Sequence, residues 1–197
     1  MTVNTSISKN DISKNISEKK VTVPIILDLK NVRPISALTA YDYTFASLID
    51  QCGIDIILVG DSLSHTVQGN QNTLPVTLDE MVYHTKCVCR GVLHSMVITD
   101  LPFLTYQISP EQGLLSAGRV MKETGACGIK LEGGVNMRET IRKIVSVDIP
   151  VVGHIGLTPQ SYHRMGGYKK HLKIISNSPL HHTENTYLHL PVTSLLG

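Results

Sequence analysis

The chain of 197 residues has no tryptophan, only two phenylalanines and few cysteines. It also contains no run of about twenty apolar residues, so we expect no membrane-spanning helix. The cysteines Cys52, Cys87, Cys89 and Cys127 lack paired metal-ligand spacing and are interpreted as structural or incidental thiols in a reducing compartment. The charge is nearly balanced, with 18 basic and 16 acidic residues, which gives no basic footprint for nucleic acid or an anionic membrane.

The first twenty residues are rich in Ser, Asn, Lys and Thr and show no sustained apolar period. This composition predicts a disordered arm, which we extend to residue 22. The arm lacks the apolar core of a signal peptide, and it contains Asp11 and Glu18 but no arginine, unlike a transit peptide. We therefore expect a cytoplasmic protein.

Apolar runs rich in β-branched residues recur along the rest of the chain, and each ends in polar side chains. Such runs, without alternation of apolar and polar residues, are typical of strands covered on both faces, as in parallel sheets. They are predicted at 54–62, 95–100, 127–132 and 149–154, and they end in Asp61 and Ser62, in Asp100, in Lys130 and Glu132, and in His154.

Helical spacing and helix start signals separate these runs. The stretch 34–40 is predicted to be a first strand after a short lead-in at 23–33, and a helix follows over 42–52, ended by Gly53. Further helices are predicted to begin at a capping box of Thr77 and Glu80, at Ser109 before Pro110, and at Asn136 with Glu139.

Five strands thus alternate with four helices, which favours right-handed crossovers and an all-parallel sheet. The predicted fold class is α/β, of the (β/α)8 TIM-barrel type, represented by about its first five strands and four helices. In such a barrel the carboxyl ends of the strands carry the chemistry, so the polar strand ends become one candidate site. A Rossmann-type sheet is the competitor, but no G-x-G-x-x-G follows the first strand.

Each of these polar residues also has an ordinary structural interpretation. Asp61 with Ser62 is typical of a turn or helix cap, and Asp100 of a turn. Lys130 and Glu132 fit a solvated ion pair at a rim. His154 fits a core or rim histidine with its hydrogen bonds satisfied. Their recurrence at successive strand ends favours a shared site over these separate interpretations.

Several long motifs in order identify a family resemblance. They are Thr-Ala-Tyr-Asp-Tyr at 39–43, Val-Gly-Asp-Ser-Leu at 59–63, Asp-Leu-Pro-Phe at 100–103, Lys-Leu-Glu-Gly-Gly at 130–134 and Gly-His-Ile-Gly-Leu-Thr-Pro-Gln at 153–160. Together they resemble ketopantoate hydroxymethyltransferase, also called 3-methyl-2-oxobutanoate hydroxymethyltransferase. The resemblance runs from about residue 30 to Lys169.

The resemblance implies a Mg2+-dependent transfer of the one-carbon unit of 5,10-methylenetetrahydrofolate to 3-methyl-2-oxobutanoate. The product is ketopantoate, on the route to pantothenate. Small-molecule partners are therefore a 2-oxo acid and a folate. By the family pattern, the Mg2+ ligands are Asp61, Asp100 and Glu132, and the 2-oxo acid is held by Asp61, Ser62, Asp100, Lys130 and His154.

The resemblance stops after Lys169, and residues 170–197 are predicted to form an unrelated tail. We accordingly expect a partial (β/α) barrel catalytic domain at 23–169, in a truncated or frameshifted product. A barrel of this type has roughly 250 residues, so two sheet edges are expected to stay open. The family places its general base, a glutamate, on a later strand, and no residue here takes that role. The family is homo-oligomeric, an assembly that we do not assign to this chain.

Three functions remain open at this point. The first is an active hydroxymethyltransferase, completed by a second polypeptide that carries the later strands. The second is a noncatalytic remnant of that enzyme. The third is another Mg2+-dependent 2-oxo acid barrel enzyme, such as a relative of phosphoenolpyruvate mutase or isocitrate lyase, which the motif at 153–160 disfavours.

Overall fold

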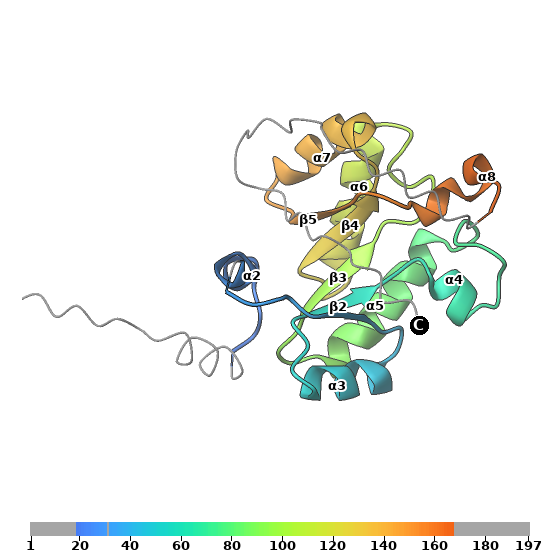
Figure 1. Cartoon of the computed structure of the whole chain (residues 1–197). Coiled ribbons are helices and arrows are strands. Elements are labelled where there is room, and N and C mark those ends of the chain that lie inside the picture. Colours follow the sequence, from blue (N-terminus) through green and yellow to red (C-terminus); the bar gives the residue numbers. More distant parts are fainter. Residues whose placement is uncertain (1–18, 31, 168–197) are drawn as a thin grey trace, which may run out of the picture.

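A computed structural model describes residues 19–30 and 32–167, and in this part five parallel strands lie side by side in chain order (Figure 1). The predicted tail at 170–197 and most of the predicted arm lie outside the described residues. A doubly wound sheet would reverse its strand order at a switch point, whereas a barrel keeps it. The sequential order therefore confirms the predicted α/β barrel-type fold. The strands are β1 (Ala37–Thr39), β2 (Ile56–Val59), β3 (Met96–Asp100), β4 (Gly128–Glu132) and β5 (Val151–His154).

Four helices connect successive strands, as predicted. The capping box of Thr77 and Glu80 is present at the start of α5, and Ser109 caps α6. The start predicted at Asn136 is wrong, because residues Val135–Met137 form a 3-10 turn (η1) and the α-helix begins after it. The connecting helices are α3 (Tyr43–Gln51), α5 (Leu78–Gly91), α6 (Pro110–Glu123) and α7 (Arg138–Val145).

The lead-in and the loops contain short helical segments that the sequence patterns did not indicate. The lead-in forms α2 (Val23–Leu29), and the loop after Asp61 begins with α4 (Leu63–Thr66). After β5 come a 3-10 turn η2 (Pro159–Ser161) and α8 (Tyr162–Met165). Among the helices of the described ranges, none combines the length and the apolar character that a membrane crossing requires.

The packed part of the chain begins at Val21, which we had placed in the disordered arm. Its side chain is buried, and its backbone N–H donates to the carbonyl of His94, 2.6 Å away. Ile26 of α2 shares an apolar cluster with Ile56 and Met96, the first residues of β2 and β3. The segment therefore covers the amino ends of the strands, and this burial explains why so short a helix forms.

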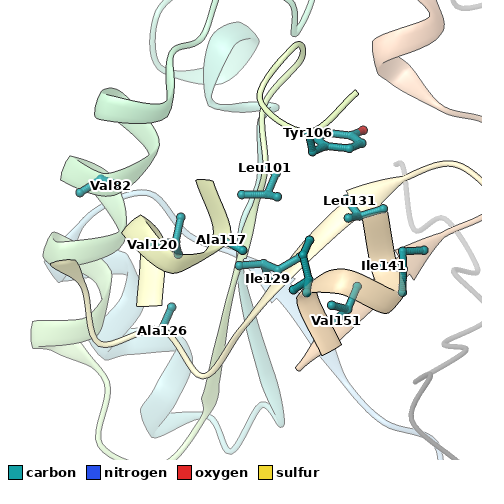
Figure 2. Packing of buried hydrophobic residues seen from close by; sticks show 11 residues of the cluster. Val82, Leu101, Tyr106, Ala117, Val120, Ala126, Ile129, Leu131, Ile141 and Val151 are labelled. Atoms are coloured by element: carbon teal, nitrogen blue, oxygen red, sulfur yellow. The ribbon is translucent and has the colours of Figure 1, made fainter. Parts of the chain in front are cut away.

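Strand residues alternate between two apolar environments. One set packs beneath the connecting helices, as Figure 2 shows for Ile129 of β4 beside Ala117 of α6 and for Val151 of β5 beside Ile141 of α7. The other set, exemplified by Ile98, faces the opposite side of the sheet together with α2. Because side chains alternate along a strand, the strand-end residues with the parity of this second set also face that side. These residues are Asp100, Lys130, Glu132 and His154.

Candidate functional site

The loop from β2 brings Asp61 against the end of β3. The backbone N–H of Asp61 donates to Asp100 Oδ2 at 3.2 Å, and both side chains are buried. A Cβ atom on Gly60 would lie 2.9 Å from the Ser62 hydroxyl and 3.4 Å from Asp100 Oδ2. Glycine before Asp61 therefore allows the two carboxylates to approach each other.

Asp100 and Lys130 form a buried ion pair between neighbouring strands. They are register partners in β3 and β4, and Lys130 Nζ donates to Asp100 Oδ1 at 2.5 Å. The parallel pairing places the two side chains on the same face, so the strand register itself creates this contact. The ammonium group is thus held beside the carboxylates at this rim.

Glu132 and His154 form the second pair of register partners, in β4 and β5. His154 Nδ1 lies 3.4 Å from Glu132 Oε1, but the contact lacks hydrogen-bond geometry. Within the described residues, Nδ1 is therefore a buried nitrogen without a hydrogen-bond partner. An unpaired buried polar atom at the carboxyl ends of the strands is a candidate contact for a ligand.

Gln160 of η2 joins the parts of this site, although the sequence analysis did not select it. Its side-chain Nε2 donates to Asp61 Oδ2 at 2.9 Å, and its backbone N–H donates to Glu132 Oε2 at 3.0 Å. The hydroxyl of Tyr106 donates to Gln160 Oε1 at 2.7 Å. The one available signal for Gln160 was its place at the end of the motif at 153–160, and Tyr106 had none.

Ser62, also a predicted site residue, forms its hydrogen bonds outside this group. Its hydroxyl lies 2.8 Å from the hydroxyl of Tyr41, and its backbone carbonyl accepts from Thr66. No hydrogen bond between the described residues links its side chain to Asp100, Lys130, Glu132 or His154. The structure thus gathers those four with Asp61 and leaves Ser62 at the side, paired with Tyr41.

The electrostatics of the site follow from its burial and its crowding of like charges. Burial, and then the neighbouring charge of Asp100, raise the pKa of Asp61 to about 7, against the stabilising hydrogen bond from Gln160. Burial alone would lower the pKa of Lys130, but the charges of Asp100, Asp61 and Glu132 outweigh it and raise that pKa. Burial also raises the pKa of the Tyr106 hydroxyl.

The donor set fits a hard divalent cation in its chemistry. Three carboxylates, from Asp61, Asp100 and Glu132, surround the single ammonium group of Lys130, so full ionisation leaves net negative charge in a buried place. Oxygen donors in small number suit Mg2+, which keeps water and substrate oxygens as further ligands. In residues 19–30 and 32–167, no three His, Cys, Asp or Glu side chains are already grouped in ligand geometry. Hydrogen bonds to Lys130 and Gln160 occupy carboxylate oxygens instead.

Comparison with known sequences finds close relatives. The chain is 55% identical over 152 residues to a 3-methyl-2-oxobutanoate hydroxymethyltransferase of Pelobacter propionicus, covering 77% of this chain and 56% of that protein. It is 57% identical over 148 residues to an enzyme of the same name from Rippkaea orientalis, covering 74% of this chain and 58% of that protein. The chain therefore spans less than three-fifths of the length of these relatives.

Solved structures resemble this chain in fold. A 2,3-dimethylmalate lyase of the PEP mutase/isocitrate lyase superfamily matches with a TM-score of 0.52 at 16% identity, over 68% of this chain and 52% of that one. A phosphonopyruvate hydrolase, solved in complex with oxalate and Mg2+, matches with a TM-score of 0.54 at 13% identity, over 74% and 52%. At such identities the likeness supports the TIM-barrel type of fold and leaves the choice of family to the sequence.

The sequence makes that choice. A model of the family described as ketopantoate hydroxymethyltransferase matches residues 20–179, a range wider at both ends than the resemblance recognised from motifs. It takes in α2 and all five strands of the described structure. This match over most of the chain, together with relatives more than half identical, decides against the PEP mutase alternative, and the chain belongs to the ketopantoate hydroxymethyltransferase family.

Proposed function

We propose that this chain carries the cation-binding and 2-oxo-acid-binding part of a cytoplasmic ketopantoate hydroxymethyltransferase. The reaction is transfer of the one-carbon unit of 5,10-methylenetetrahydrofolate to 3-methyl-2-oxobutanoate, which gives ketopantoate on the route to pantothenate. The observation that carries the proposal is the buried cluster of Asp61, Asp100 and Glu132 around one lysine at the carboxyl ends of the strands.

The proposed roles of the site residues follow from their charges. Asp61, Asp100 and Glu132 would hold Mg2+, which when bound supplies a Lewis acid for the 2-oxo group of the substrate. Lys130 supplies positive charge for the carboxylate of the 2-oxo acid or for negative charge that develops on the reacting oxygen. Its ammonium group is held in place by Asp100, so it needs no reorganisation when the substrate arrives.

His154 and Ser62 are the remaining residues of the proposed substrate pocket. The buried Nδ1 of His154 has no hydrogen-bond partner among the described residues and is available to a polar group of the substrate. The Ser62 hydroxyl is hydrogen-bonded to that of Tyr41 and directly follows Asp61 in the chain, and its contact with the substrate rests on the family pattern. The family pattern places the general base on a strand later than β5, so we assign that role to no residue described here.

Calorimetric titration tests the proposal on the chain itself. We expect 3-methyl-2-oxobutanoate to bind when Mg2+ is present and not when it is absent, because cation and substrate share the carboxylate site. Asp100→Asn is expected to abolish this Mg2+-dependent binding. The matched control is Asp28→Asn, a change at an exposed aspartate of α2 that leaves binding unaltered. Binding of the oxo acid that ignores Mg2+ would contradict the proposal.

Deuterium exchange separates binding from chemistry. In D2O with Mg2+, we expect no exchange at C3 of 3-methyl-2-oxobutanoate beyond that caused by Mg2+ and buffer, because a positioned base contributes about 10²- to 10⁴-fold. Exchange that depends on the chain would place a competent base within it. That result would replace the binding assignment with a catalytic one, which production of ketopantoate on addition of 5,10-methylenetetrahydrofolate would confirm.

A further inference from the structure

We propose that Gln160 is the positioning residue that holds the carboxylates of Asp61 and Glu132 in place for the divalent cation. The inference rests on the proposed function, since it concerns the same carboxylates. Gln160 is buried in the turn after β5, and 99 positions separate it from Asp61. Only the fold brings the two residues together.

Gln160 contacts both carboxylates through different groups. Its side-chain Nε2 donates to one oxygen of Asp61, and its backbone N–H donates to one oxygen of Glu132. The same Nε2 also donates to the carbonyl of Leu101, at 3.0 Å, directly after the ion-paired Asp100. One residue therefore links the ends of β2, β3 and β4.

The neighbours of Gln160 determine how its amide is oriented. Oε1 accepts from the Tyr106 hydroxyl at 2.7 Å and from Gln107 Nε2 at 3.0 Å. Nε2 faces two acceptors, a carboxylate and a carbonyl. A flipped amide would place its oxygen against those two acceptors and its NH2 group against a donor. The network thus requires the N–H groups to point at Asp61.

A neutral amide suits this task better than a second cation would. Lys130 orients Asp100 but also offsets its charge. Gln160 orients Asp61 and leaves the carboxylate charge, when ionised, available to a bound metal ion. Hydrogen-bonding groups that orient metal ligands typically change metal affinity by about 10- to 100-fold when they are removed.

The test replaces the amide and keeps its volume. Gln160→Met removes both side-chain N–H donors while filling the same space, and Mn2+ binding is followed by electron paramagnetic resonance. We expect Mn2+ affinity to fall about tenfold or more. Tyr106→Phe, which removes the hydroxyl that fixes Oε1, is expected to lower the affinity in the same direction but less. Gln51→Met, at an exposed position of α3, is the matched control and leaves the affinity unchanged.

The outcomes separate this inference from the proposed function. A role confined to packing would lower the thermal midpoint of Gln160→Met and leave its Mn2+ affinity at the wild-type value. That result overturns the inference while the proposed function stands. Absence of Mn2+ binding by the wild-type chain overturns both. If Gln160→Met does not fold, Tyr106→Phe decides, and wild-type Mn2+ affinity in that variant overturns the inference.

Discussion

Buried aspartates at the two ends of the sheet have pKa values that are shifted in opposite directions. At the amino ends of the strands, Asp50 and Asp55 are surrounded by hydrogen-bond donors, and the pKa of each is lowered. At the carboxyl ends, Asp61 is surrounded by other carboxylates, and its pKa is raised. Burial raises the pKa at all three positions, but hydrogen-bond donors outweigh it at Asp50 and Asp55, whereas the charge of Asp100 adds to it at Asp61.

The amino end shows how a buried charge becomes structural. Burial would raise the pKa of Asp50, but N–H groups of Ser95, Leu93 and His94 donate to its carboxylate and lower that pKa to about 2. For Asp55, burial is likewise outweighed by Arg33, which donates to both carboxylate oxygens at 2.6 and 2.7 Å. The carboxylates of Asp50 and Asp55 therefore hold the segments that precede β3 and β2 in place.

The carboxyl end keeps its charges incompletely compensated. Asp61, Asp100 and Glu132 share one ammonium group, and the strongest donor to Asp61 is a neutral amide. In barrels of this type the amino face serves stability and the carboxyl face serves function. The contrast illustrates that division for the same side chain: an aspartate with several hydrogen-bond donors at one end, and an aspartate crowded by other carboxylates at the other.

The largest expected effect is a loss of stability caused by a substitution at the amino ends of the strands. Asp50→Ala removes the acceptor of three backbone N–H groups, and each hydrogen bond to a charged group is worth about 1.5 to 3 kcal/mol. We expect the free energy of unfolding in urea to fall by about 3 to 5 kcal/mol. Asp28→Ala, at an exposed aspartate, is the control and should change it little. Similar losses in both variants would refute the structural role of Asp50.

A smaller effect, with the opposite sign, is expected at the carboxyl end. The pKa of Asp61 is about 7 in the folded chain, against an ordinary value of 3.8 for an aspartate in water, so the folded state holds a proton that the unfolded state releases. Stability is therefore fully present below about pH 4 and is lost as the pH rises through 7.

Asp61→Asn cannot lose that proton and should remove this dependence. The variant is expected to gain about 2 to 4 kcal/mol relative to wild type between pH 4 and 8, without added metal. Urea unfolding at several pH values measures the difference. A constant difference across this range would show that Asp61 is not crowded, and the contrast between the two ends would fail.

The smallest expected effect tests whether a loss of stability by itself lowers metal affinity. Thr77→Ala removes the side chain that accepts from the N–H of Glu80 at the start of α5. Loss of such a cap typically costs about 1 kcal/mol. We expect this loss in urea unfolding together with unchanged Mn2+ affinity. A loss of affinity as large as that of Gln160→Met would mean that any destabilisation impairs the site.

Much of the fold was predictable because it depends on local periodicity. The strand positions, their parallel order and the caps at Thr77 and Ser109 all follow from patterns within a few residues. The helix α2 was missed because a seven-residue helix derives its stability from packing, here against residues of β2 and β3. The start at Asn136 was misplaced because a 3-10 turn precedes α7.

Site residues that lie on strands could be predicted from the sequence, whereas those on the connecting segments could not. Asp100, Lys130 and Glu132 share one rim because parallel strands end on the same side. Tyr106 and Gln160 come from connecting segments whose course no pattern specifies. Asp50 lies on a predicted helix, but its partners just before β3 are more than forty positions away.

By itself the sequence determined the strands, the polar residues that end them and the family to which the chain belongs, because these depend on neighbouring residues and on motif order. Tertiary structure alone decided which aspartates have shifted pKa values and which side chains orient them. The physical reason is that desolvation and Coulomb interaction depend on distances in space. Burial and the charge of Asp100, 39 positions away, raise the pKa of Asp61, and Gln160 reaches Asp61 across 99 positions.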